Sequence, residues 1–125
     1  MFQPINSTYG IDLFAVNIQR GRDHGLATYT EWRSICNMPI VNEWPDLDDT
    51  MRPSSLRVMK SIYKHPQDVD LYVGILSEIA LDDAILGPVG SCIVADQFVR
   101  LKQGDRFWYE TSDPLLKFTL GQSIN

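Results

Sequence analysis

The chain has 125 residues, enough for one domain, and a formal net charge of −5 with an isoelectric point near 4.8. This acidic balance excludes the basic face that nucleic-acid binding requires, and no apolar run approaches the roughly 20 residues that span a bilayer. The two cysteines, Cys36 and Cys92, are too few for a tetrahedral zinc site, and their spacing leaves open two free thiols or one disulfide.

A predicted loop over residues 1–10, which contains the glycosylation sequon Asn6-Ser7-Thr8, precedes the clearest helix signal of the chain. Asp12 can cap a helix over about 13–24, and Gly25 can take the left-handed conformation that ends one. At steps of four, three and four residues, one stripe of this helix carries Leu13, Asn17, Arg20 and His24. Core helices rarely aim an amide, a guanidinium and an imidazole inward, so the stripe indicates a bound group. A long planar anion with a metal-bound imidazole beside it would satisfy all three side chains.

A second helix is predicted over about 28–36. Thr28-Tyr-Thr-Glu31 has the spacing of a capping box, in which the side chains of the first and fourth residues exchange hydrogen bonds with the backbone. We expect this helix to bury Trp32 together with either Ile35 or Cys36, and Pro39 to stop it.

A loop over 37–52 and a third helix over about 53–63 come next. The loop carries the acidic run Asp46-Leu-Asp-Asp49, which lacks the glycine and the glutamate of a calcium-binding loop, so we favour a solvated acidic segment. Pro53 suits a first helical turn. Apolar side chains then recur at helical spacing at Leu56, Met59, Ile62 and Tyr63.

Three helices are predicted in the second half. A short helix through 71–75 can be capped by Asp68 or Asp70, and a final helix over about 112–120 by Ser112-Asp-Pro114. Between them, a long helix over about 89–102 should end at Gly104, and it has apolar side chains available for burial at Ile93, Phe98 and Leu101. Strand-like alternation is nearly absent, so the class is all-α, with about five to six helices and irregular loops.

The segment Asn17-Ile-Gln-Arg-Gly-Arg-Asp-His-Gly-Leu26 resembles the signature of the animal haem peroxidases, the superfamily that includes myeloperoxidase, peroxidasin and the insect chorion peroxidases. A second long match is Ala95-Asp-Gln-Phe-Val-Arg-Leu-Lys-Gln-Gly-Asp-Arg-Phe-Trp-Tyr-Glu110. Between them, Asp68-Val-Asp-Leu-Tyr-Val-Gly74, Ser77-Glu78 and Gly87-Pro88 follow in the family's order. The resemblance therefore covers nearly the whole chain.

The resemblance implies that residues 1–125 are the C-terminal part of a longer peroxidase domain, with the N-terminal haem-ligand and distal regions outside this chain. By motif position, Asn17 corresponds to the asparagine that accepts a hydrogen bond from the proximal histidine of the haem. Arg20 corresponds to the arginine that pairs with a haem propionate, and Leu13 and Val16 would supply apolar surface on the proximal side. Arg22, Asp23 and His24 are expected to have structural roles. No residue of this chain is expected to ligate a metal, His24 and His65 included.

The cofactor implied is haem, and the family's calcium site lies outside this chain. The implied reaction is oxidation of a small donor by hydrogen peroxide, as in a response to oxidative stress, with the remainder of the peroxidase domain as partner. Family members carry a disulfide at the positions of Cys36 and Cys92, which implies an oxidising, secreted or extracellular location. The alternative is a peroxidase-like domain that lacks catalysis and serves in assembly or adhesion. The sequence favours the enzyme because it retains Asn17 and Arg20.

Overall fold

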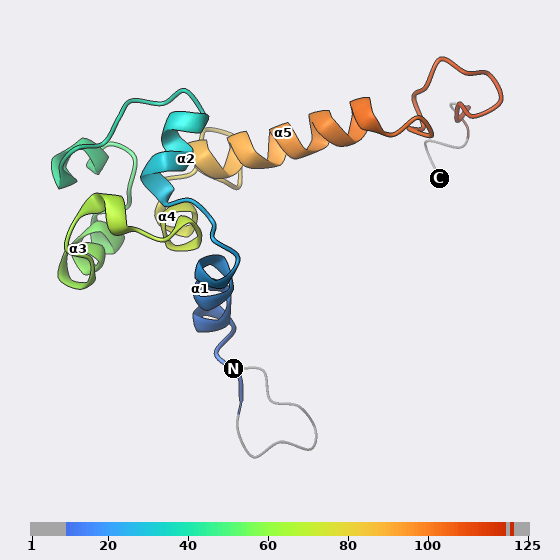
Figure 1. The fold of residues 1–125 in the computed structure, drawn as a ribbon. Helices are drawn as coiled ribbons and strands as arrows, with labels where there is room; N and C mark the ends of the chain where they lie inside the picture. The colour runs from blue at the N-terminus through green and yellow to red at the C-terminus, as the bar shows by residue number, and fades with distance from the viewer. Residues whose placement is uncertain (1–9, 120, 122–125) are drawn as a thin grey trace. The chain divides into compact units, whose positions relative to one another are not determined.

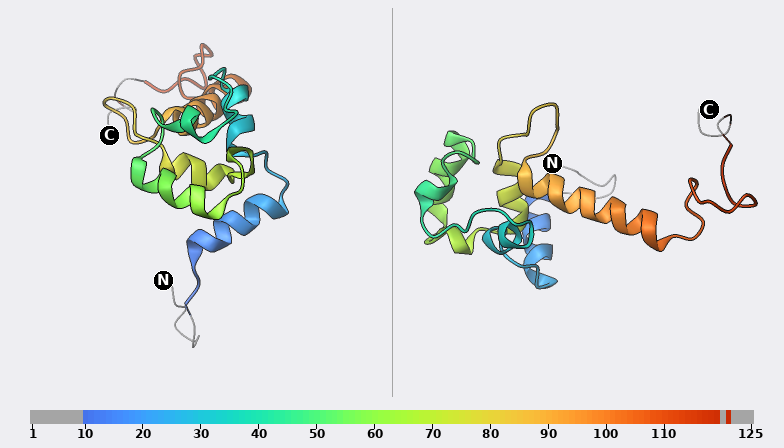
Figure 2. Two further views of the ribbon diagram at one scale, coloured as in Figure 1. Left: turned by 90° about the vertical axis from the view of Figure 1, so that its left-hand side faces the viewer. Right: turned by 90° about the horizontal axis from the view of Figure 1, so that it is seen from above.

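The computed structural model describes residues 10–119 and 121, and these residues fold almost entirely as helices (Figure 1). The elements are α1 Leu13–Asp23, α2 Tyr29–Ile35, η1 Trp44–Leu47, α3 Pro53–Ile62, η2 Pro66–Asp68, α4 Leu71–Ser77 and α5 Pro88–Gly104, where η marks a 3-10 helix. An isolated β-bridge joins Met51 and Glu78. The all-α class is confirmed, and further views show the irregular loops that join the helices (Figure 2).

The chain divides into two compact units, Met1–Ser91 and Cys92–Asn125. In the first unit, α4 contacts both α1 and α2, and α2 also contacts η2. The apolar core of this unit lies among these helices and the loops that follow them; it consists of Tyr29, Val41, Leu47, Met51, Leu56, Met59, Val69 and Val89. The second unit holds most of α5 and the aromatic segment after it.

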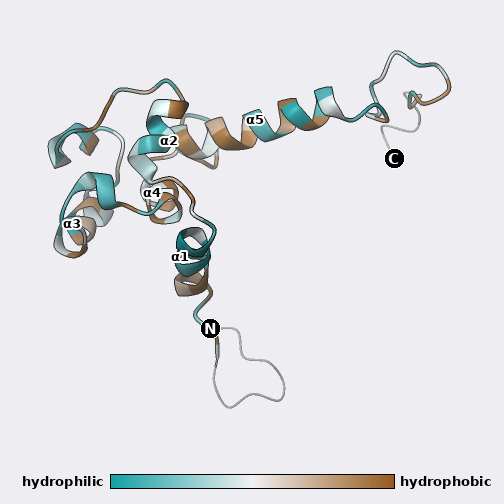
Figure 3. Ribbon diagram, viewed as in Figure 1, coloured by the Kyte–Doolittle hydropathy of each residue, from teal (hydrophilic) through white to brown (hydrophobic). Residues whose placement is uncertain are grey.

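Both ends of α1 form as the sequence predicts. The Asp12 carboxylate accepts from the backbone N–H groups of Phe14 and Ala15, and Gly25 has φ +64°, the left-handed conformation that follows a helix end. The helix is apolar in its first turn and polar after it (Figure 3). None of its residues is fully buried, so α1 lies on the surface of its unit.

The capping box of α2 also forms: Thr28 and Glu31 exchange both hydrogen bonds. The predicted buried face of α2 forms only in part. Trp32 and Cys36 are half-buried and Ile35 is 60% exposed, whereas the buried residues are Tyr29, Thr30 and Arg33. The helix turns this way because the Tyr29 ring packs directly on Gly74 of α4, which leaves no room for another side chain there.

Two predictions in the second half need correction. Phe98 and Leu101 of α5 are not buried but exposed, by 60% and 46%. The predicted final helix is absent from the described part of 112–120, where residues 114–116 form only a turn. The chain reverses there instead, because the Phe118 N–H donates to the Tyr109 carbonyl and the two rings contact edge to face. Leu120 and the sequon at Asn6 lie outside the described residues.

Both cysteines are disulfide-bonded and neither is a free thiol, as the resemblance implies. None of the helices that the structure describes is long and apolar enough to cross a membrane.

Candidate functional site

The stripe predicted on the first helix lies on an exposed face of α1. Leu13 is 49% exposed, Val16 and Asn17 are half-buried, and Arg20 is exposed. Within residues 10–119 and 121, neither the Asn17 amide nor the Arg20 guanidinium has a hydrogen bond or an ion pair. An amide and a cation that stand unpaired beside apolar side chains can bind a group from outside this chain.

A pocket of about 590 Å³ opens along this helix. Its lining from α1 consists of Asn17, Ile18, Arg20, Gly21, Arg22 and His24, and its lining from the other side includes Asp68, Asp70, Leu71, Tyr72 and Ile75. The three polar residues of the predicted stripe therefore share one pocket with the start of α4. Its remaining walls are largely apolar, which is the usual character of a small-molecule or cofactor site.

Arg22, two residues after Arg20 and thus on the other side of the helix axis, lines the same pocket together with Asp70. Its Nε and Nη2 donate to the two carboxylate oxygens of Asp70 at 2.8 and 2.7 Å, and the Tyr63 hydroxyl donates to the same carboxylate at 2.7 Å. The hydrogen bonds from Arg22, ahead of the one from Tyr63, hold the pKa of the Asp70 carboxyl below its usual range. Burial, together with the hydrogen bond to Asp70, raises the pKa of Tyr63 to about 12.

The two arginines of the motif thus have different roles. Arg22 is engaged within the chain, which agrees with the structural role expected of it, and Arg20 is available for a ligand. His24 has its Nδ1 2.8 Å from the Arg20 carbonyl, and because a carbonyl only accepts, Nδ1 carries the proton. This bond ties the imidazole to the end of its own helix. The other histidine, His65, donates its backbone N–H to the Asp68 carboxylate.

A haem fits the exposed face of α1 in its chemistry. The Arg20 guanidinium can donate two parallel hydrogen bonds to a carboxylate such as a propionate. The Asn17 side-chain oxygen can accept from an imidazole N–H, and Leu13 and Val16 offer apolar surface next to both. The described residues contain no cluster of three or more histidine, cysteine or acidic side chains that could hold a metal ion.

Sequence reasoning assigned no role to Glu78, which is 2% exposed at the centre of the first unit. Its carboxylate accepts from the Tyr29 hydroxyl at 2.8 Å and from the backbone N–H groups of Val89 and Gly90 at 3.1 to 3.3 Å. The buried carboxylate therefore joins α2 to the first turn of α5. Burial, more than any neighbour, raises the pKa of Tyr29 well above its usual value, so its hydroxyl stays protonated and donates.

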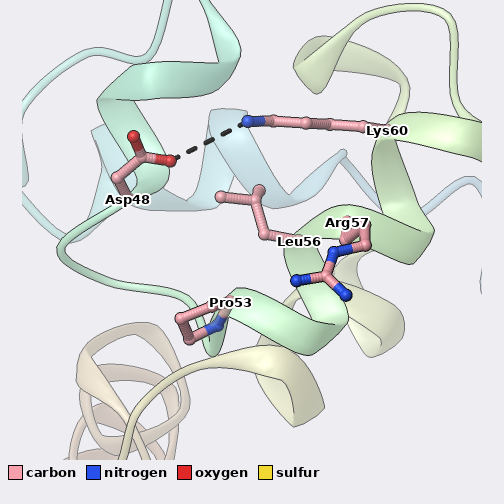
Figure 4. A pocket seen from close by; sticks show the side chains of 5 residues that line it. All are labelled: Asp48, Pro53, Leu56, Arg57 and Lys60. Atoms are coloured by element: carbon pink, nitrogen blue, oxygen red, sulfur yellow. Dashed lines mark ion pairs between the residues drawn. The ribbon is translucent and has the colours of Figure 1, made fainter.

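The acidic run after residue 45 is used for structure. Asp46 accepts from the backbone N–H groups of Asn42 and Glu43, which begin the turn into η1. Asp48 faces Lys60 of α3 at 3.9 Å across a pocket of about 330 Å³ that Pro53, Leu56 and Arg57 complete (Figure 4). Both partners of this pair are exposed, so it contributes little to stability.

The described residues thus form an all-α unit in which one helical face carries an amide and a guanidinium that have no partner among these residues. Comparison with known proteins identifies the family: the model for the animal haem peroxidase family matches residues 1–124. The chain belongs to the animal haem peroxidase family.

Curated relatives and a solved structure agree. The chain is 43% identical over 113 residues to the peroxidasin homolog pxn-2 of Caenorhabditis elegans, which covers 90% of this chain and 8% of that protein. It is 41% identical over 117 residues to a peroxidase of Drosophila melanogaster, covering 94% of this chain and 17% of the relative. Peroxidase A from Dictyostelium discoideum matches with a TM-score of 0.74 and 38% identity over 85% of this chain, or 20% of that chain. The chain thus spans less than a fifth of the length of these curated relatives.

Proposed function

We propose that residues 1–125 form the C-terminal part of a haem peroxidase domain that oxidises a small donor with hydrogen peroxide. The observation that carries this proposal is the difference between the two arginines of α1. Arg22 is paired with Asp70, whereas Arg20 and Asn17 share the exposed face with Leu13 and have no partner among the described residues. Family membership supports haem as the group that this face contacts.

Asn17 is proposed to accept a hydrogen bond from the proximal histidine, which lies outside this chain. An acceptor on the outer ring nitrogen fixes the tautomer and the plane of the imidazole and raises the donor strength of the ligating nitrogen. An amide oxygen does so less strongly than a carboxylate, so Asn17 sets an intermediate donor strength. The haem, when bound, supplies the redox chemistry of the peroxide reaction.

Arg20 is proposed to hold a haem propionate. Because its guanidinium has no partner among the described residues, binding a propionate breaks no contact between these residues. Leu13 and Val16, one turn or less before Asn17 and Arg20, would cover the proximal side of the macrocycle and exclude water from it. The remainder of the peroxidase domain completes the pocket. The disulfide-bonded cysteines support a secreted or extracellular location.

The test compares Arg20→Gln with Arg57→Gln in the full-length protein that carries this chain. Arg57 lies exposed on α3, so it is a matched arginine away from the proposed site. Loss of a residue that supports a bound cofactor typically costs about tenfold or more in affinity or activity. Arg20→Gln should therefore lose haem about tenfold faster, and Arg57→Gln should match wild type.

Equal haem loss in both variants would contradict the role of Arg20. A full-length protein that binds haem through Arg20 but shows no donor oxidation would instead support the peroxidase-like domain without catalysis.

A further inference from the structure

The face of α1 opposite Arg20 is fastened to the first unit through one carboxylate. Asp70 accepts two hydrogen bonds from Arg22 and a third from Tyr63, the residue that follows α3. The end of α1, the end of α3 and the start of α4 therefore meet at this single side chain. Asp70 is well shielded, with 14% of its side chain exposed.

Asp70 occupies a position where a carboxylate normally has another task. It is the N-cap residue of α4, yet its side chain makes no capping hydrogen bond. An N-cap bond typically contributes about 1 kcal/mol. The Asp70 carboxylate does not make this local bond and instead accepts hydrogen bonds from Arg22 and Tyr63. This arrangement indicates a role in fixing the helices to which these two residues belong or which they follow.

The geometry of a helix connects this contact with the proposed haem face. At about 100° per residue, Arg20 and Arg22 lie roughly 160° apart around α1. At the other end of α1, Phe14 contacts the Tyr72 ring of α4 with centroids 5.2 Å apart. Phe14 and Arg22 anchor α1 at both ends, so together they set its rotation about its own axis.

We infer that Asp70 is a positioning residue that holds α1 at the rotation in which Asn17 and Arg20 face the haem. The inference rests on the proposed function. A rotation of α1 by about 20° would displace side chains at its surface by roughly 2 Å, given a helix radius of about 5 to 6 Å. A hydrogen bond does not survive a displacement of this size, so loss of the anchor weakens the contact of Asn17 with the proximal imidazole.

The test uses Asp70→Asn, Asp70→Glu and Arg22→Lys in the full-length holoenzyme, with Asp96→Asn as the matched control. Asp96 of α5 also accepts from an arginine, Arg100, but both side chains are exposed. The readouts are the iron reduction potential, the iron–imidazole stretch and the rate of haem loss. A loss of stability that leaves the haem environment intact changes neither the reduction potential nor the iron–imidazole stretch.

We expect Asp70→Asn and Arg22→Lys to raise the reduction potential, in the same direction as Asn17→Ala, and to speed haem loss about threefold. Asp70→Glu keeps the charge and should recover part of the shift, and Asp96→Asn should match wild type. A lower melting temperature of Asp70→Asn with an unchanged potential and stretch would overturn the inference. If Asp70→Asn does not fold, Arg22→Lys decides in the same way, because 59% of the Arg22 side chain is exposed.

Asn17→Ala, measured beside these variants, separates the two claims. If Asn17→Ala changes the potential and Asp70→Asn does not, the positioning role alone fails. If Asn17→Ala changes neither the potential nor the stretch, the proposed function fails, and the inference fails with it.

Discussion

Gly74 is the position where one added methyl group should do the most damage. A Cβ at this residue would lie 2.7 Å from the Cβ of Tyr29 and closer still to two atoms of its ring. The ring cannot move aside, because Tyr29 is fully buried and its hydroxyl is bound to Glu78 at 2.8 Å. Overpacking such a site lowers the free energy of unfolding by up to about 3 kcal/mol. The better helix propensity of alanine returns about 1 kcal/mol, so we expect Gly74→Ala to destabilise the protein by about 2 kcal/mol.

The assay is thermal unfolding of the full-length protein, with Gly21→Ala as the matched control. Gly21 also lies inside a helix, but the nearest atom to an added Cβ is 3.7 Å away. Gly21→Ala should therefore be neutral or stabilising by up to about 1 kcal/mol. A Gly74→Ala protein that melts at or above wild type would refute the packing of Tyr29 on α4.

Three further predictions follow from the buried carboxylate, the Arg22–Asp70 pair and the chain by itself. Glu78→Gln turns an amide N–H₂ toward backbone donors and should lower the free energy of unfolding by about 1 to 3 kcal/mol. Glu110→Gln is the exposed control and should not change the melting temperature. The folded pKa of Asp70 is lowered, so its stabilising contribution is present above the ordinary carboxyl pKa and is lost as the pH falls through the lowered folded value. The melting temperatures of wild type and Asp70→Asn should therefore start to converge as the pH falls below about 4 and meet below the folded pKa, and a constant gap contradicts this. Residues 1–125, expressed alone and mixed with haem, should oxidise a donor no faster than an equal concentration of free haem; faster turnover with one haem bound per chain would mean that this chain holds its own axial ligand.

The helix ends could be predicted because they depend on neighbours in the sequence. Asp12 caps α1, the Thr28–Glu31 box opens α2, and Gly25 takes the left-handed conformation, all through contacts within a few residues. The periodicity of α1 likewise predicted which side chains share one stripe, since that depends only on residue spacing. These interactions form wherever the local sequence allows them.

The contacts that fix the helices against one another could not be predicted. Arg22 meets Asp70 from 48 residues away and Tyr29 meets Glu78 from 49, and periodicity carries no information about such pairs. The error at α2 has this origin: Trp32 and Ile35 have the more apolar side chains, but the flat surface of Gly74 selects Tyr29 for burial. The role of Asp70 was missed because an aspartate before a helix predicts an N-cap, and two distant donors take its carboxylate instead.

The contact of Asn17 with the proximal imidazole is tested most directly by the reduction potential of the Asn17→Asp variant of the full-length protein. A carboxylate is a stronger acceptor than an amide oxygen, so it makes the imidazole more anionic and stabilises the oxidised iron. The potential should fall below that of wild type while haem stays bound. An unchanged potential with haem retained would show that Asn17 does not touch the proximal ligand.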